Sequence, residues 1–248
     1  MRSSLPGGQR DNMEYVFFCD FDGTVTREDV IDRVLEEFAD PAWIDIERSW
    51  VNGEIGSRDC LTMQTQLIKA KERDLLDFVE GIGIDETFVD FAGYCKSNAI
   101  EIFILSDGID LFIKSILNRY GLNDIRIFAN SLGTTNGSYK MYFPYFREDC
   151  LSKAGICKCK MMEELSIPEG INILVGDGRS DFCLARKADL TFAKSTLLDF
   201  CRVEKITHIE HREFRDVIEW LRNQIGQRGS VGSQRTFIRH SLRRARNG

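Results

Sequence analysis

The sequence has little of what several protein classes require. Its 248 residues contain only 4 Pro and 20 Gly and no sustained heptad pattern, which excludes collagen-like and coiled-coil chains. No apolar run approaches the roughly 18 residues of a membrane-spanning helix. The first twelve residues are polar and lack the apolar centre of a secretory signal. These absences predict a soluble, cytoplasmic protein with no membrane partner.

Histidine is also scarce, with 3 residues, whereas the 8 cysteines are scattered along the chain. Cys150, Cys157 and Cys159 invite a zinc hypothesis, but their spacing differs from the paired C-x2–4-C pattern of structural zinc sites. We therefore expect ordinary reduced thiols. His208 and His211 are expected beside a surface loop and not as metal ligands.

Positive charge gathers at the two ends of an otherwise acidic chain. The formal net charge is −6, from 39 Asp and Glu against 33 Lys and Arg. Residues 227–248 hold six Arg and no acid or Lys. The acidic body disfavours nucleic acid as a partner. We expect a flexible tail at 1–12 and a basic, disordered tail at 227–248, and binding of an anionic partner by the Arg-rich tail is the alternative.

Short apolar runs alternate with amphipathic stretches in the body of the chain. The predicted strands are residues 15–18, 100–105, 125–129, 171–175 and 190–193, and helices are expected at 88–96, 109–120, 158–165, 180–187 and 214–225. This alternation predicts an α/β fold with a parallel sheet and helices on both faces. Residues 27–84 have helical spacing throughout, so we expect a small all-helical domain inserted into a core made of 13–26 and 85–226.

The first predicted strand ends in two carboxylates, in Asp20-Phe21-Asp22-Gly23-Thr24. Alternate residues of an extended segment point the same way, so Asp20 and Asp22 can share one pocket. One carboxylate can attack as a nucleophile while the other moves a proton, and a cation would offset their repulsion. The alternative is a turn that caps the next helix, but the position directly after a buried strand favours catalysis.

A second pair of acids follows the strand at 171–175, in Gly176-Asp177-Gly178-Arg179-Ser180-Asp181. The two acids lie four residues apart across a glycine turn and can both face a metal ion. Because Mg²⁺ takes oxygen ligands and keeps several waters, we expect Asp177 as a direct ligand and Asp181 as a water-linked one. A plain helix N-cap is the alternative for this segment.

Residues 19–24 resemble the first motif of the haloacid-dehalogenase-type phosphatases. The segments Leu105-Ser106-Asp107-Gly108 and 176–181 are similar to later motifs of that superfamily and stand in its order. The resemblance spans roughly residues 15–221. The helical insert resembles the cap of the phosphoserine-phosphatase branch. Within that branch, the Pro41-Ala42-Trp43 turn and the Cys157-Lys158 pair are similar to the methionine-salvage 2-hydroxy-3-keto-5-methylthiopentenyl-1-phosphate phosphatases.

The resemblance implies a Rossmann-like core with a helical cap, Mg²⁺ as cofactor, and hydrolysis of a small phosphorylated metabolite through an aspartyl-phosphate. The catalytic residues that it implies are Asp20, Asp22 and Lys158, with Lys153 and Lys160 as the other candidates for the phosphate-binding lysine. The implied metal ligands are Asp20, Asp22 through its carbonyl, Asp177 and Asp181. The implied substrate contacts are Thr24, Ser106, Asp107 and Gly108, with Asp29 and Arg58 on the cap side.

Two departures leave the substrate open. The second motif reads Ser-Asp-Gly instead of Ser-Gly-Gly, and the fourth matches neither type fully. The leading function is a phosphomonoester hydrolase for the enol-phosphate of methionine salvage, and the enzymatic alternative is a phosphatase for phosphoserine or another small ester. The alternative from another class is a non-catalytic scaffold with an Arg-rich binding tail. A homodimer is the oligomeric state that we keep as a candidate.

Overall fold

A computed structural model describes residues 15–135, 137–150 and 153–226. The predicted tails at 1–12 and 227–248 lie outside this part of the chain. Within it, no helix is long and apolar enough to cross a membrane.

The framework of the fold is a seven-stranded sheet in the order β4-β3-β2-β1-β5-β6-β7. All neighbouring strands are parallel except β4, which pairs antiparallel with β3. The strands are β1 (Tyr15–Cys19), β2 (Glu101–Ile109), β3 (Arg126–Thr135), β4 (Ser138–Tyr142), β5 (Ile171–Gly176), β6 (Leu190–Ala193) and β7 (His208–Glu210). The predicted α/β class with a parallel sheet is confirmed.

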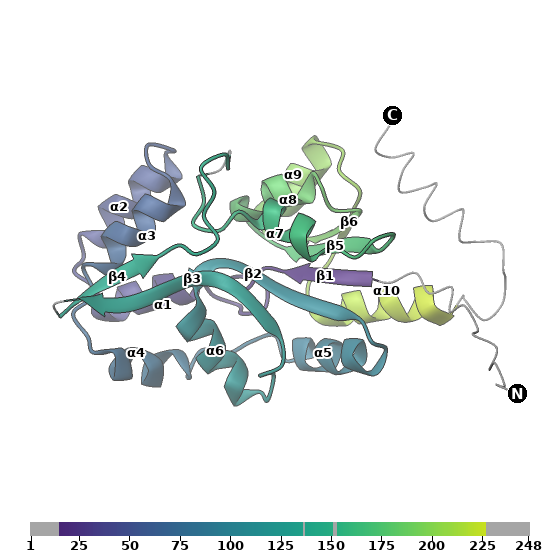
Figure 1. The fold of residues 1–248 in the computed structure, drawn as a ribbon, viewed down its shortest axis with the longest axis horizontal. Coiled ribbons are helices and arrows are strands. Elements are labelled where there is room, and N and C mark those ends of the chain that lie inside the picture. The colour runs from purple at the N-terminus through teal and green to yellow at the C-terminus, as the bar shows by residue number, and fades with distance from the viewer. Residues whose placement is uncertain (1–14, 136, 151–152, 227–248) are drawn as a thin grey trace, which may run out of the picture.

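Helices cover both faces of this sheet (Figure 1). They are α1 (Val30–Phe38), α2 (Trp43–Val51), α3 (Ser57–Thr65), α4 (Glu72–Val79), α5 (Thr87–Ser97), α6 (Asp110–Arg119), α7 (Lys158–Leu165), α8 (Phe182–Ala185), α9 (Ser195–Val203) and α10 (Phe214–Gly226), with a 3-10 turn η1 (Arg179–Asp181). Successive residues of a strand face opposite sides. Accordingly, Phe17 packs into the cluster that contains residues of α5, α6 and α10, and Phe18 packs into the cluster of α7, α8 and α9.

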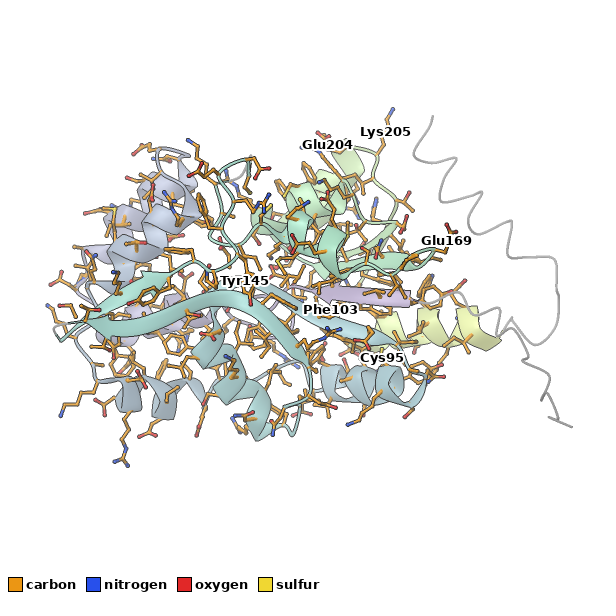
Figure 2. The ribbon with its side chains drawn as sticks, in the orientation of Figure 1. Cys95, Phe103, Tyr145, Glu169, Glu204 and Lys205 are labelled. Carbon is orange, nitrogen blue, oxygen red and sulfur yellow. The ribbon has the colours of Figure 1, made fainter. Side chains whose placement is uncertain are left out.

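The interior is mostly apolar, and the labelled Glu169, Glu204 and Lys205 lie at its outside (Figure 2). Phe103, Cys95 and Phe18 are almost fully buried, whereas Glu204 and Lys205 project beside α9. Every strand of the central four, β2, β1, β5 and β6, has mostly buried residues. A sheet with apolar residues on both faces is rigid, and it fixes where the ends of its strands lie.

The segment between β1 and α5 contains the four helices α1–α4, in the stretch predicted to be all-helical. An isolated bridge between Thr26 and Ile84 joins its two ends, and a second bridge joins Ala39 to Ile68. The helices α1 and α4 share the apolar cluster of the core, and α3 contacts β4. The division into a core and a separate cap stays a prediction, because one continuous apolar cluster crosses the predicted boundary.

Three local expectations differ from the structure. The strand β2 runs on to Ile109, past Ser106, with a register shift between Leu105 and Ile109 against β3. The predicted helix at 180–187 is a 3-10 turn followed by the four-residue helix α8. The expected loop around His208 and His211 contains the short edge strand β7, and His211 is only 2% exposed. The 3-10 turn, α8 and β7 carry too few residues for a periodic pattern.

Candidate active site

The ends of three neighbouring strands bring the predicted motifs together. Because β2, β1 and β5 are adjacent and parallel, their carboxyl ends meet at one edge of the sheet. Asp20 follows β1 directly, and its backbone N–H donates to the Val175 carbonyl of β5 at 2.9 Å. Asp177 follows β5, and Ser106 lies in β2. Edges of this kind are the usual ligand sites of parallel α/β sheets.

A buried lysine bridges two of the acids. The Lys158 Nζ lies 2.8 Å from Asp20 Oδ1 and 2.8 Å from Asp181 Oδ1, and these three residues are at most 6% exposed. It also donates to the Ser180 Oγ at 3.0 Å. Burial alone would lower the pKa of Lys158, but the two acids outweigh it and raise the pKa above its usual range. Lys158 therefore stays charged.

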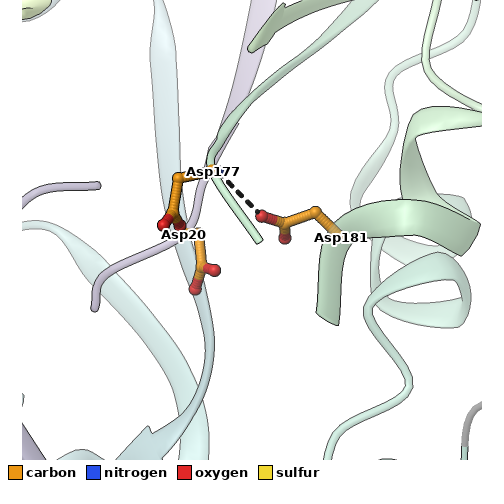
Figure 3. A group of neighbouring side chains, drawn as sticks. All are labelled: Asp20, Asp177 and Asp181. Atoms are coloured by element: carbon orange, nitrogen blue, oxygen red, sulfur yellow. Dashed lines mark hydrogen bonds between the residues drawn. The ribbon is translucent and has the colours of Figure 1, made fainter. Parts of the chain in front are cut away.

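Asp20, Asp177 and Asp181 each offer a carboxylate oxygen within 4.8 Å of the others, so this group could hold a metal ion (Figure 3). The Asp177 N–H donates to Asp181 Oδ2 at 3.3 Å, and the Thr24 hydroxyl donates to Asp177 Oδ1 at 3.1 Å. Burial, followed by the charge of Asp20, raises the pKa of Asp177 to about 6. One lysine does not balance three converging acids, and a cation would supply the missing charge.

Asp22 lies apart from this acidic group. Its Oδ1 accepts from the Val30 N–H at 2.9 Å, and its Oδ2 accepts from the Ser106 hydroxyl at 3.2 Å. Burial, and then the charge of Asp29, raises the pKa of Asp22 well above its usual value. A raised pKa favours the protonated form of a carboxyl, which suits general acid and base catalysis.

Gly23 lies against the carboxylate of Asp177, and Gly108 lies against the carboxylate of Asp22. Gly23 has a φ of +69°, and a Cβ there would lie 2.5 Å from Asp177 Oδ2. A Cβ on Gly108 would lie 2.7 Å from Asp22 Oδ2, and the Gly108 N–H donates to the Ser106 Oγ at 2.9 Å. A larger residue at either position would push a carboxyl out of place.

The acids open into a cavity of about 230 Å³ between the strand ends and the helices α1–α3. Its core side includes Asp20, Asp22, Asp107, Gly108 and Asp177. Its other side includes Asp29, Asp32, Glu47 and Trp50, and Arg179 adds a cationic side chain. A cavity of this size suits a small metabolite.

The predicted cap-side residues fall in different places. Asp29 lines the cavity and caps α1, because its side chain accepts from the N–H groups of Ile31 and Asp32. Arg58 is not among the residues that line the described cavity. Its guanidinium lies 4.4 Å from the centre of the Phe146 ring and pairs with Asp59.

Of the three candidate lysines, only Lys158 contacts the acids in the described residues. Lys160 is on the outer side of α7, in an ion pair with Glu163, and its side chain is 39% exposed. The Thr24 hydroxyl donates to Asp177 Oδ1, and its role as a substrate contact stays a prediction.

Other residues at the site were missed by the sequence analysis. The Ser180 hydroxyl donates to Asp20 Oδ2 at 3.3 Å, and the Lys194 Nζ reaches the Thr24 carbonyl at 3.4 Å. Ser57 and Asn130 bind Asp107. Ser180 stands inside the quoted segment 176–181, whereas Ser57 and Asn130 lie in segments with no motif of their own.

The comparisons with known proteins agree with this geometry. The sequence profile of the family described as "Putative Phosphatase" matches residues 15–224. The chain belongs to this phosphatase family. It is 31% identical to the 2-hydroxy-3-keto-5-methylthiopentenyl-1-phosphate phosphatase of Brevibacillus brevis over 209 residues, 83% of this chain and 94% of that protein. A phosphatase of the same name from Geobacillus thermodenitrificans is 31% identical over 84% of this chain and 96% of that protein.

Solved structures support the fold of this phosphatase. A substrate-bound phosphoserine phosphatase superposes with a TM-score of 0.67 and 21% identity, covering 85% of this chain and 99% of that chain. A phosphoserine phosphatase solved as an analogue of its phospho-aspartyl intermediate has a TM-score of 0.64 and 22% identity, covering 84% and 99%. The predicted resemblance to a family of phosphatases is confirmed, and the fold is that of the phosphoserine phosphatases.

Proposed function

We propose that this phosphatase is a Mg²⁺-dependent phosphomonoester hydrolase that forms an aspartyl-phosphate on Asp20. The observation that carries the proposal is the Asp20 carboxylate at the cavity, 2.8 Å from the buried Lys158 Nζ and grouped with Asp177 and Asp181. A bound Mg²⁺ supplies positive charge to these acids and to the phosphoryl oxygens. The three carboxylates fit this ion because their oxygens converge and their charge exceeds that of Lys158.

Asp20 and Asp22 have separate roles in the reaction. Asp20 attacks phosphorus, and the bond between phosphorus and the ester oxygen breaks. Asp22 gives its proton to the leaving alkoxide, and afterwards takes a proton from the water that attacks the aspartyl-phosphate. The raised pKa of Asp22 supports this role, since the group must carry a proton at the start. Lys158 and Ser106 stabilise the phosphoryl oxygens, where phosphoryl transfer needs charge compensation most.

The relatives suggest the leading substrate. Two relatives at 31% identity are named 2-hydroxy-3-keto-5-methylthiopentenyl-1-phosphate phosphatases, and this chain covers more than nine tenths of each. The cavity volume of about 230 Å³ is compatible with such a small ester. We therefore place the phosphorylated enol of methionine salvage first.

The acidic wall favours a second candidate, an ester whose alcohol carries an ammonium group, such as phosphoserine. Asp29, Asp32 and Glu47 line the cavity opposite the core, and Trp50 lines it as well. Carboxylates and an indole face both attract an ammonium ion. The methylthio group of the enol-phosphate is neutral, so it cannot form an ion pair with these acids.

The test is phosphate release from a panel that contains the enol-phosphate, phosphoserine, phosphoethanolamine and p-nitrophenyl phosphate. Each ester is assayed with Mg²⁺ and with EDTA, for the wild type and Asp20→Asn. We expect release that requires Mg²⁺ and disappears in the variant. A 10-fold preference in kcat/KM for the enol-phosphate would support the first candidate, and the same preference for the ammonium esters would support the second. Absence of release from every ester would contradict the proposal and favour the non-catalytic scaffold.

A further inference from the structure

Hydrogen bonds from three separate segments converge on Asp107. The Ser57 hydroxyl, at the start of α3, donates to Asp107 Oδ2 at 2.5 Å. The Ile156 N–H donates to Oδ1 at 3.1 Å. The Asn130 side-chain amide, from β3, donates to the Asp107 carbonyl at 2.6 Å and to Oδ1 at 3.1 Å.

These contacts use both oxygens of the Asp107 carboxylate. The side chain therefore has protein partners already, and its negative charge is a poor match for a phosphate group. Its neighbours in β2 differ, because Ser106 and Gly108 lie against Asp22. The predicted role of Asp107 as a substrate contact is thus less consistent with its surroundings than a role in holding the protein together.

The segments held by Asp107 also approach one another closely. A Cβ on Gly155 would lie 2.8 Å from Asp107 Oδ1 and 2.7 Å from the Asn130 side chain. A Cβ on Gly56, the residue before Ser57, would lie 3.0 Å from the Lys153 carbonyl. The turn before α3 therefore sits directly on the turn that leads into α7.

The turn before α3 and the turn before α7 both adjoin the active site. Ser57 lines the cavity, and α3 forms part of its outer wall. Ile156 stands two residues before Lys158, the lysine that bridges Asp20 and Asp181. A second contact joins the same two sides, since the Arg179 guanidinium donates to the Val51 carbonyl of α2 at 3.1 Å.

We infer that Asp107 is a positioning residue that fastens the start of α3 to the turn before Lys158. Through Ser57 it holds the outer wall of the cavity against the strand ends, and through Ile156 it fixes the approach to the lysine. This inference rests on the proposed function, because a closed wall serves to enclose the leaving group and to exclude water. The Ser57–Asp107 bond must break whenever the wall opens to admit an ester.

The kinetic test compares Ser57→Ala, Asp107→Ala and the double variant, with p-nitrophenyl phosphate as substrate and inorganic phosphate as inhibitor. Ser57→Ala removes only the wall side of the bond. We expect the KM to rise about 10-fold, in line with a hydrogen bond to a charged group, while kcat stays within about 2-fold. The inhibition constant of phosphate should not change, because phosphate binds the core side alone.

Asp107→Ala should lower kcat as well, since the turn before Lys158 loses its anchor. The double variant should be no worse than Asp107→Ala, because Ser57 acts through Asp107. Ser57→Thr keeps the hydroxyl and should restore the wild-type KM. Thr62→Ala is the matched control on α3, since the Thr62 hydroxyl bonds to the Arg58 carbonyl of its own helix.

Hydrogen exchange of the unliganded protein supplies a readout that does not require activity. In Ser57→Ala and Asp107→Ala, residues 54–60 and 153–158 should exchange faster than in the wild type, and α5 should not. Unchanged exchange at 54–60 would overturn the inference. So would a loss of kcat/KM in the double variant that equals the product of the losses in the two single variants. If the wild type releases no phosphate from any ester of the panel, the proposed function fails, while the exchange result still decides whether Asp107 fastens α3.

Discussion

The two sides of the cavity handle negative charge differently. On the core side, Asp20 and Asp181 form ion pairs with the buried Lys158. On the outer side, neither Asp32 nor Glu47 takes part in any ion pair among the described residues. The core side therefore has a buried cation that compensates part of its charge before any ligand binds, whereas Asp32 and Glu47 on the outer side have no such cation among the described residues.

We expect the core side to carry out the reaction and the outer side to select the substrate. The strand ends hold the reacting groups in a rigid setting, because buried strands on both sides fix them. Asp32 of α1 and Glu47 of α2 line the cavity and form no ion pair among the described residues, so a ligand can supply the opposite charge. Burial and the charges of Asp29 and Glu47 raise the pKa of Asp32 to about 7. This raised pKa reflects the excess of negative charge on the outer side. Four substitutions test this difference between the core side and the outer side.

The largest effect is expected from Asp20→Asn, on the core side. The substitution keeps the size of the side chain and removes the nucleophile, so kcat should fall by about a thousand-fold or more. The thermal unfolding midpoint should change little, because Lys158 keeps Asp181 as a partner. Phosphate release and circular dichroism measure the two quantities. Retained turnover in a folded variant would remove Asp20 from the mechanism.

The second change is Lys158→Met, with Lys160→Met as its matched control. Loss of Lys158 leaves two buried acids without a cationic partner, which costs about 3 to 5 kcal/mol of unfolding free energy. The exposed pair of Lys160 with Glu163 contributes at most about 1 kcal/mol. Urea unfolding measures both, and the activities should fall in the same order. Equal effects of the two variants would contradict the assignment of Lys158.

The third change, Asp32→Asn, addresses the outer side. The folded-state pKa of about 7 exceeds the ordinary 3.8, so the folded state binds the proton more tightly than the unfolded state does. The wild type therefore loses stability as the pH rises from about 4 to 7. Asp32→Asn should unfold at a higher temperature than the wild type at pH 8, and the difference should shrink toward pH 5.

The control for this pH dependence is Asp45→Asn on α2, where the side chain is 80% exposed and pairs with Arg48. Its difference from the wild type should be the same at pH 5 and pH 8. A difference for Asp32→Asn that does not depend on pH would show that Asp32 is not strained by its neighbours.

The smallest effect is expected from Arg58→Ala. The guanidinium lies over Phe146 and outside the residues that line the described cavity. The kcat/KM should change less than about 2-fold, because a partly exposed cation–π contact contributes only about 0.5 to 1 kcal/mol, mostly to local packing. A loss of 10-fold or more would return Arg58 to the substrate contacts that the resemblance implied.

The sheet class and the main carboxyl groups of the site could be predicted from the amino-acid sequence alone. Apolar runs that end in acids predict parallel strands with polar carboxyl ends, and the structure brings Asp20, Asp177 and Asp181 together at that edge. The four helices between β1 and α5 follow from helical spacing over the same stretch. These features are local, because each depends on a strand or helix and the residues beside it.

Only the tertiary structure decided how the distant segments meet. Lys158 and Lys160 both stand near the start of α7, and the packing of that helix turns one toward Asp20 and the other toward solvent. Ser57 and Asp107 lie fifty residues apart and become partners because α3 folds back onto the strand ends. Contacts of this kind depend on the summed packing of many residues, and no short pattern along the chain encodes them.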